Sequence, residues 1–477
     1  MAVDYNLVIL GGSLVAHHAA VRAAEWGARV ALVEPPRSPA DWEREQLQLA
    51  YLQAGQEPWD STRPSDRQTM TMGSRVLPLD WDGKIGHRLA EANTFAAWQL
   101  DQSDPASLAF KGIDVVTGSG AFVDGPTLAV QVGERVLRGH HYLIAGAAVP
   151  HIPPALEQSH ITSLQHLGQV QPQSVAVWGE HPQTLVLAQA LQRLGLLVVL
   201  ATPANRLLPQ EDLEVVNLIQ AQLEADGVSV ITSASLADAG AQRGEAPDSI
   251  EIRSGSLILR VDRVMSPSTY APNFSTLVLP AAIKTTPSAV IVNRQLQTGH
   301  PRIYACGYTL DANCTTAVAI AEAEVAVDNA LSLPYRHVPY TRIPQTLLTD
   351  PPAVRIGLTA RQALQRHRGA VVLRQILAPL KRTQLEGSPP GLCQLVVSKQ
   401  GRILGACAIG PAAQEWCSLL VWAIARRMTL QSLNLTWPGS AYGEVILSLA
   451  NQWRWQRRRW LVKRLEPLWN WRRDWTR

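Results

Sequence analysis

Short apolar runs and glycines alternate through the first 34 residues in a pattern typical of strand, turn, helix and strand. Residues 7–10 form an apolar run that ends at Gly11 and Gly12, and alanines then recur at helical spacing as far as Gly27. A second apolar run ends at Glu34. This βαβ pattern suits a dinucleotide, because a turn without side chains lets the backbone and helix N-terminus approach a pyrophosphate. A carboxylate after the second strand can hold ribose hydroxyls.

The same pattern begins again at Ser174, where an apolar strand, a turn, a helix and another strand follow one another. Two such units predict two nucleotide-binding domains or two descendants of them. Residues 302–308 are predicted to form a strand, and residues 315–331 a helix, that return the chain to the first domain. Residues 336–450 have a proline-rich entry and a hairpin pattern that turns at 399–401, which predicts an α+β segment.

The composition is that of a folded, water-soluble chain, with 46% hydrophobic and 17% charged residues. No stretch reaches the roughly 18 apolar residues of a membrane-spanning helix. The N-terminus carries no secretion signal, so we expect a cytoplasmic protein or one bound peripherally to a membrane face. Five cysteines, at positions 306, 314, 393, 407 and 417, lack the spacing of a metal site, and we expect reduced thiols and no bound metal.

The net charge of +4 is concentrated at the C-terminal end. Residues 451–477 carry eight Arg and one Lys against two acidic residues, a net charge of +7, and six of the fifteen tryptophans. The rest of the chain therefore has a net charge of −3. Tryptophan prefers the membrane–water interface and arginine pairs with anionic headgroups, so this tail predicts binding to an anionic membrane surface.

Two alternatives for the tail stay open, namely packing on the protein itself or a protein complex, and nucleic-acid binding. Nucleic acid is the less favoured of the two, because the rest of the chain is acidic. The residues expected to contact the membrane or partner are Trp453, Trp455, Arg457, Arg458, Arg459, Trp460, Trp469, Trp471, Arg472, Arg473 and Trp475.

Four stretches resemble the pyridine nucleotide–disulfide oxidoreductase family, which includes dihydrolipoamide dehydrogenase, glutathione reductase and mercuric reductase. They are HYLIAGAAVPHIP (141–153), RIYACGY (302–308), IPQTLLTDPPAVRIGLTARQA (343–363) and RILGACAIGPAAQE (402–415). The resemblance covers residues 4–450. It implies an α/β fold with two Rossmann-like nucleotide-binding domains, of FAD and NAD type, followed by an α+β dimerisation domain and the Trp/Arg-rich tail. A homodimer is implied as well.

The resemblance also gives expected domain boundaries. The FAD-binding domain would comprise residues 1–150 and 265–335, and the NAD(P)-binding-like domain residues 151–264. The dimerisation domain would span 336–450, and the basic tail 451–477.

For FAD, the resemblance implies a binding site at Gly11, Gly12, Ser13, Ala16, Glu34, Ala121, Gly146, Gly307 and Tyr308. Ser13 is small and can donate a hydrogen bond to phosphate. Tyr308 stands where the family has an aspartate that binds the ribityl chain of the flavin, and a phenol is larger. The alternative is that these residues only maintain the turns of the fold.

The second glycine motif departs further from the family pattern. Gly179, His181 and Thr184 stand where the family has three glycines, which predicts a degenerate NAD(P)H site. An imidazole at position 181 obstructs the approach of a pyrophosphate, although a protonated His181 can pair with phosphate. The alternative places His181 as a surface turn residue.

The thiol chemistry of the family has no counterpart in the sequence. The family's two redox cysteines would fall in residues 41–55, which contain no sulfur, and no cysteine precedes residue 306. Trp437 and Pro438, with Glu444 seven residues after Trp437, replace the family's catalytic histidine, proline and glutamate, and indole cannot shuttle protons. We assign no catalytic residue and expect neither disulfide nor mercuric reductase activity.

Two functions therefore remain. One is an FAD-dependent oxidoreductase that passes electrons to a non-thiol acceptor, such as a quinone at a membrane face. The other is a pseudoenzyme, a catalytically inactive dimeric scaffold that binds a membrane or protein complex through its tail.

Overall fold

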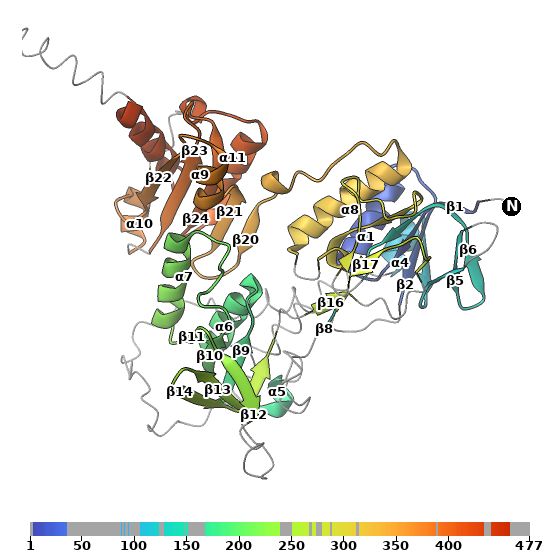
Figure 1. Ribbon diagram of the computed structural model, residues 1–477, viewed down its shortest axis with the longest axis horizontal. Helices are drawn as coiled ribbons and strands as arrows, with labels where there is room; N and C mark the ends of the chain where they lie inside the picture. Colours follow the sequence, from blue (N-terminus) through green and yellow to red (C-terminus); the bar gives the residue numbers. More distant parts are fainter. Residues whose placement is uncertain are drawn as a thin grey trace, which may run out of the picture. The chain divides into compact units, whose positions relative to one another are not determined.

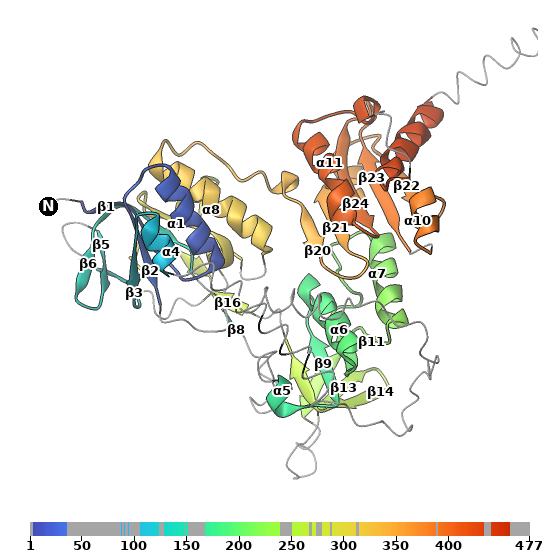
Figure 2. The same ribbon diagram turned by 180° about the vertical axis from the view of Figure 1, so that it is seen from behind.

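The computed structural model forms two compact units (Figures 1 and 2). The first unit comprises Met1–Pro209 and Leu223–Pro339, and the second Gln210–Gln222 and Tyr340–Arg477. The structure describes residues 3–35, 87, 90, 94, 105–123, 128–146, 148–150, 167–238, 250–266, 270–272, 279–286, 289–311, 314–387, 390–433 and 440–457.

A parallel five-stranded sheet with the order β19-β7-β1-β2-β3 lies at the centre of the FAD-type half of the first unit. Its strands are β1 (Tyr5–Leu10), β2 (Val30–Glu34), β3 (Ile113–Thr117), β7 (Gly139–Ile144) and β19 (Ile303–Ala305). Helices α1 (Leu14–Glu25) and α8 (Thr316–Leu331) lie side by side against it (Figures 1 and 2). The buried face of α1 is mostly alanine, which lets the helix pack closely on the sheet. The predicted βαβ unit is confirmed.

A second parallel sheet has the order β11-β10-β9-β15. Its strands are β9 (Ser174–Trp178), β10 (Leu197–Ala201), β11 (Ser229–Ile231) and β15 (Arg263–Met265). Helix α6 (Pro182–Leu194) connects β9 to β10 and completes the second predicted βαβ unit. An antiparallel sheet of β12 (Ser235–Asp238), β13 (Ile250–Ser254) and β14 (Leu257–Val261) follows in the chain.

Smaller elements complete the first unit. One antiparallel sheet contains β4 (Ala121–Val123), β5 (Ala129–Val132) and β6 (Arg135–Leu137). Two strand pairs are formed by β8 (Ala148–Pro150) with β16 (Tyr270–Pro272), and by β17 (Thr285–Thr286) with β18 (Ala289–Val290). The short helices are α4 (Pro105–Phe110), α5 (Leu167–Val170) and η3 (Gly307–Thr309).

The second unit is an antiparallel sheet with the order β20-β21-β24-β23-β22, flanked by helices. Its strands are β20 (Gln345–Leu347), β21 (Ala353–Gly357), β22 (Val371–Ile376), β23 (Leu392–Val397) and β24 (Ile403–Ile409). Its helices are α9 (Ala360–Arg366), α10 (Lys381–Leu385), α11 (Ala413–Ala425), η4 (Tyr340–Arg342), η5 (Leu430–Leu433) and a helix over residues 444–457. The hairpin predicted to turn at 399–401 is confirmed as the link between β23 and β24.

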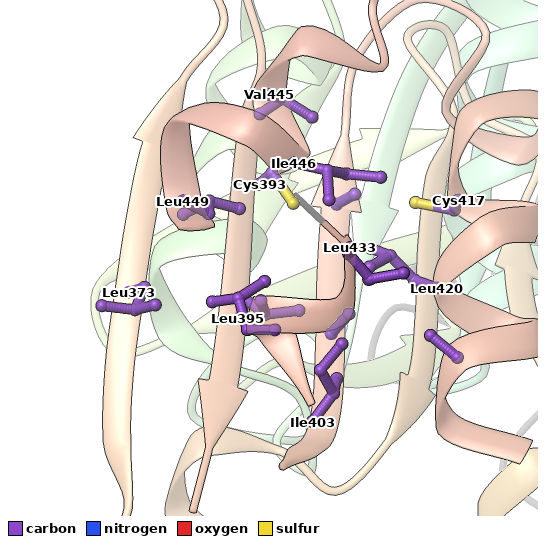
Figure 3. Packing of buried hydrophobic residues seen from close by; sticks show 14 of the residues in the cluster. Leu373, Cys393, Leu395, Ile403, Cys417, Leu420, Leu433, Val445, Ile446 and Leu449 are labelled. Carbon is purple, nitrogen blue, oxygen red and sulfur yellow. The ribbon is translucent and has the colours of Figure 1, made fainter. Parts of the chain in front are cut away.

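The core of the second unit lies between this sheet and its helices (Figure 3). Leu395 on β23, Leu420 of α11 and Ile446 of the 444–457 helix belong to this one cluster (Figure 3). All three side chains are fully buried. Burial of a side chain of this size contributes about 1.5–3 kcal/mol to stability, so the C-terminal helix is an integral part of this unit.

Residues 210–222 pack with the second unit, although they were predicted to belong to the NAD(P)-binding-like domain. They include most of α7 (Leu213–Ala225). The carboxylate of Asp212 accepts hydrogen bonds from the backbone N–H of Ala360, at 3.1 Å, and from Nε2 of Gln394, at 3.0 Å. Glu214 forms an ion pair with Arg374. These polar contacts hold the segment against the five-stranded antiparallel sheet.

The tail was predicted to begin at residue 451, but its first described residues lie in the helix over residues 444–457 of the second unit. Trp453 is 3% exposed and belongs to the core of the second unit, so its assignment as a membrane or partner contact is corrected. A Cβ added to Gly401, at the hairpin turn, would lie 2.9 Å from Nε1 of Trp453, which shows how closely the ring packs there. Gln452 donates hydrogen bonds to the carbonyl oxygen of Arg374 and to Oε1 of Gln375, both at 3.0 Å.

The remaining tail residues divide into two groups. Trp455 is 69% exposed, and the guanidinium carbon of Arg457 lies 5.7 Å from the centroid of the Trp453 ring. The predicted tail residues outside the described part of the chain are Arg458, Arg459, Trp460, Trp469, Trp471, Arg472, Arg473 and Trp475. Among the helices that the structure describes, none combines the length and the apolar character needed to cross a membrane.

Candidate functional site

The first glycine turn joins the C-terminal end of β1 to α1. Gly11 has φ +147°, and a Cβ there would lie 2.2 Å from the carbonyl oxygen of Ala145, so the fold itself requires glycine. Gly12 is different, because a Cβ there would make only ordinary contacts, at 3.6 Å from Cδ of Pro35 and 3.8 Å from Cβ of Glu34. The missing side chain at Gly12 therefore leaves room beside Glu34 that the fold does not need.

Ser13 is the N-cap of α1. Its hydroxyl accepts a hydrogen bond from the N–H of Ala16, at 3.3 Å, and donates one to the carbonyl oxygen of Ala145, at 3.1 Å. The hydroxyl proton is thus used within the protein, and in this geometry the side chain of Ser13 does not serve the phosphate contact that the sequence predicted. The other N–H groups of the first turn have no partner within the helix, and they are the groups that suit a pyrophosphate.

Glu34 ends β2 and is 5% exposed. Its Oε1 contacts Nε2 of His17, which is also 5% exposed and lies on α1 four residues after Ser13. His17 is not among the residues predicted from the sequence. A polar residue on an otherwise alanine-rich helix face was the signal that marked it.

Gly307 and Tyr308 form the start of η3, which follows β19. The N–H of Gly307 donates to Oε2 of the buried Glu322 on α8, at 2.8 Å. The hydroxyl of Tyr308 lies 3.4 Å from Oγ1 of Thr316, the first residue of α8. Tyr308 is half-buried, so its phenol is placed at the N-terminal end of α8. Glu322 was also missed, because it looks like an ordinary helix carboxylate in sequence.

Gly146 and Ala121 complete the predicted set. A Cβ on Gly146 would lie 3.3 Å from Cγ2 of Thr309, close to η3. Ala121 begins β4, directly after Gly120, whose added Cβ would lie 2.9 Å from Leu10 at the end of β1. The structure thus brings the predicted residues of the first site together around the C-terminal ends of the parallel strands, which is where open α/β sheets bind ligands.

The residues present fit the adenosine diphosphate half of FAD. The space at Gly12, the N-terminus of α1 and the buried carboxylate of Glu34 follow one another as the pyrophosphate and ribose require.

At the second glycine turn, side chains of the protein take up the groups and the space that a nucleotide would need. His181 is the N-cap of α6, and its Nδ1 accepts a hydrogen bond from the N–H of Gln183 at 3.2 Å. Thr184 is fully buried, and its hydroxyl donates to the carbonyl oxygen of His181 at 2.6 Å. His181 therefore uses an N–H group that a phosphate would need, and Thr184 occupies the position where a third glycine would let helix and strand pack closely. Gly179 lies at the C-terminal end of β9, before this cap.

The described thiols are mostly inaccessible. Cys306, Cys393, Cys407 and Cys417 are buried, and Cys314 is half-buried. Burial, together with the carboxylate of Glu322, raises the pKa of the Cys306 thiol well above its usual value, and burial raises the pKa of Cys393 to about 12. Such thiols are unreactive as nucleophiles, because the thiolate is the reactive form.

The predictions that the redox cysteines and the catalytic histidine are lost concern residues 41–55 and Trp437. These residues lie outside the described part of the chain. Glu444 is described, and its Oε1 accepts a hydrogen bond from the N–H of Ser440 at 3.2 Å, which is a local turn contact.

Comparison with known proteins relates most of the chain to one family. Residues 5–330 match the family described as pyridine nucleotide-disulphide oxidoreductase, and residues 343–439 match its dimerisation domain. The mercuric reductase of Staphylococcus aureus is 27% identical over 440 residues, which cover 90% of this chain and 79% of that protein. A dihydrolipoyl dehydrogenase of Bacillus subtilis is 25% identical over 425 residues, which cover 86% of this chain and 90% of that protein.

A solved structure has the same fold. The HOCl-induced flavoprotein disulfide reductase RclA from Escherichia coli aligns with a TM-score of 0.75 at 20% identity, over 94% of this chain and 99% of that one. The family match implies FAD and NAD(P)H as cofactors, and the dimerisation domain supports a homodimer. Because the match spans both nucleotide-binding sheets and the C-terminal sheet, the chain belongs to the pyridine nucleotide-disulphide oxidoreductase family.

Proposed function

We propose that this protein is an FAD-dependent oxidoreductase that does not reduce disulfides or mercuric ions and passes electrons to a non-thiol acceptor. The observation that carries the proposal is the absence of cysteine from residues 1–305. A dithiol relay needs two thiols close enough to form a disulfide. The buried, high-pKa thiols of Cys306 and Cys393 are poor substitutes.

In this proposal the first glycine turn holds the cofactor. The N-terminus of α1 would bind the pyrophosphate of FAD in the space beside Gly12, and Glu34 would bind the adenosine ribose. When bound, FAD supplies two-electron and one-electron redox chemistry that the side chains of the protein lack. Tyr308, held near Thr316, would face the site with a neutral hydroxyl in place of a carboxylate.

The acceptor is proposed to be a quinone at an anionic membrane face. The support is the cationic, Trp-rich composition of residues 451–477, since arginine and tryptophan favour such a surface. The described Trp455, exposed on the C-terminal helix, is consistent with this role, whereas the buried Trp453 has a structural one.

A second candidate function, a pseudoenzyme scaffold, draws on a different observation. His181 caps α6 and Thr184 fills the space of a third glycine, so the second nucleotide site has lost features that NAD(P)H uses in this family. A protein that keeps the fold but binds neither cofactor would act through its tail and its dimer surface alone.

Assays with thiol and non-thiol acceptors separate these functions. We expect no measurable reduction of lipoamide, glutathione disulfide or mercuric ion by the pure protein with NADH or NADPH. With the same NADH or NADPH as electron donor, ferricyanide or a soluble quinone should be reduced by the flavin-loaded protein. A variant with Cys306 and Cys314 changed to alanine should behave identically, which rules out a relay built from these two cysteines. Substantial turnover of a disulfide would contradict the proposal, and inertness toward every acceptor would favour the scaffold.

Light scattering tests the assembly. The 52.1 kDa chain should have about twice that mass in solution, because the matched dimerisation domain pairs two copies about a twofold axis. A chain ending at Arg457 serves as the control and should keep the dimer mass if the C-terminal sheet forms the interface. A monomer at micromolar concentration would mean that this domain serves another partner, with the half-exposed Trp422 on α11 as the first residue to examine.

A further inference from the structure

The buried contact between His17 and Glu34 is not explained by the packing of the fold. Both side chains are 5% exposed, and Nε2 of His17 meets Oε1 of Glu34. The alanine face of α1 already packs closely on the sheet without a polar pair. Removing a carboxylate from water is costly unless it is paired or hydrogen-bonded, so a pair that only filled space would be a poor choice there.

The His17–Glu34 pair lies beside the first glycine turn, which suggests a role in ligand binding. A Cβ added to Gly12 would lie 3.8 Å from Cβ of Glu34 and 3.9 Å from its Cγ, so the carboxylate borders the space left by that glycine. His17 holds one oxygen of Glu34, and among the described residues no side chain or N–H donates to the other oxygen, Oε2. A carboxylate fixed on one side and open on the other is suited to a pair of neighbouring hydroxyl groups.

We propose that His17 is a positioning residue for the sugar of a bound adenine nucleotide. It holds Glu34 in the one rotamer in which Oε2 can accept hydrogen bonds from the 2′ and 3′ hydroxyls of the ribose. This inference rests on the proposed function, since it requires the adenosine half of FAD to bind at the first glycine turn. It adds a residue outside the glycine motif that determines recognition of the sugar.

The physical gain is preorganisation. A nucleotide that meets an already ordered carboxylate does not lose the entropy of ordering that side chain on binding. Without His17, the buried Glu34 carboxylate would lose the donor that fixes its Oε1, and the side chain would turn toward water. In that orientation it would be a weaker acceptor for the ribose hydroxyls. Hydrogen bonds to a charged group are the stronger kind, so the loss should be measurable.

The test compares two ligands that differ only in the sugar hydroxyls. The flavin-stripped full-length protein is titrated by calorimetry with ADP and with 2′,3′-dideoxy-ADP. We expect the wild type to bind ADP at least about tenfold more tightly, as hydrogen bonds to a charged group imply. His17→Ala should bring the two affinities to within about twofold, by weakening ADP while leaving dideoxy-ADP unchanged. His17→Gln should recover part of the preference, because its side-chain amide can donate to Glu34. Glu34→Gln should lose the preference as His17→Ala does.

Three results would overturn the inference while leaving the proposed function intact. The first is an unchanged preference in His17→Ala, and the second is an equal loss for both ligands, which is a purely structural effect. The third is tighter ADP binding by His17→Ala, which would mean that the imidazole competes with the nucleotide. If the wild type binds neither ADP nor FAD, the proposed function fails and this inference fails with it.

Discussion

Gly12→Val should give a folded protein that purifies without flavin. The added Cβ has room at 3.6 Å from Pro35 and 3.8 Å from Glu34, so the backbone should keep its conformation. The two γ-methyl groups, however, extend into the space where the pyrophosphate must approach the N-terminus of α1. We expect FAD affinity to fall by roughly a hundredfold or more, which corresponds to about 2.7 kcal/mol. The measurement is the flavin absorbance of the purified protein, followed by titration with FAD.

Two matched substitutions sharpen this prediction. Gly12→Ala adds only the Cβ and should give an intermediate loss of FAD with an unchanged melting temperature. Gly11→Ala should instead destabilise the fold, because its Cβ would lie 2.2 Å from the carbonyl oxygen of Ala145 at a φ of +147°. Full flavin content in Gly12→Val would show that the cofactor does not pass beside this residue. A colourless wild type that takes up no FAD would remove the oxidoreductase proposal.

The sequence was sufficient for the two βαβ units because their signals are local. Alanines at helical spacing, apolar strands and a glycine turn lie within about 30 residues of one another, which is the length of such a unit. The hairpin between β23 and β24 was predictable for the same reason, since its turn and both strands are contiguous in the chain. Local patterns of this kind specify elements, and the order of the elements then limits the fold.

The features that the sequence did not predict depend on contacts between distant residues. Residues 210–222 follow the second βαβ unit in sequence but belong to the second compact unit, where Asp212 accepts hydrogen bonds from Ala360 at the start of α9 and from Gln394 of β23. Trp453 looked like its neighbours in a Trp/Arg-rich tail, but helical spacing places it on the buried face with Ile446 and Leu449, while Trp455 is exposed. Composition described the tail as a whole and could not separate these two faces.

In the candidate site, too, some residues follow from local sequence patterns and others only from contacts in the folded chain. The glycine turn and Glu34 follow from the βαβ pattern, whereas His17 becomes significant only once α1 is folded against β2. From the sequence, His181 is predicted to obstruct a pyrophosphate, to pair with phosphate when protonated, or to be a surface turn residue. The structure adds a third role, since Nδ1 of His181 caps α6 and so competes for the N–H groups that a phosphate would use.

A truncation that tests the role of the C-terminal tail must leave the buried residues of the second unit in place. Deleting residues 451–477 would remove Trp453, and loss of such a buried aromatic costs roughly 3–5 kcal/mol, so we expect this deletion to destabilise the second unit. A chain that ends at Arg457 keeps the buried ring and removes residues 458–477, which hold four tryptophans and a net charge of +5. This truncated chain should fold normally and lose binding to phosphatidylserine vesicles by about a hundredfold or more, since each basic residue near such a surface contributes about 1 kcal/mol.

Substitutions within the tail separate ring insertion from charge attraction. Replacing Trp460, Trp469 and Trp471 by alanine keeps the charge, so binding to anionic vesicles should weaken but remain sensitive to salt. In the wild type, raising the salt concentration should weaken binding only in part, because ring insertion is not screened as charge attraction is. Trp455→Ala, on the exposed face of the described helix, should add a smaller loss without affecting the melting temperature. If the intact protein ignores anionic vesicles and instead co-purifies with one protein complex through residues 458–477, the tail is a docking peptide and the membrane proposal is wrong.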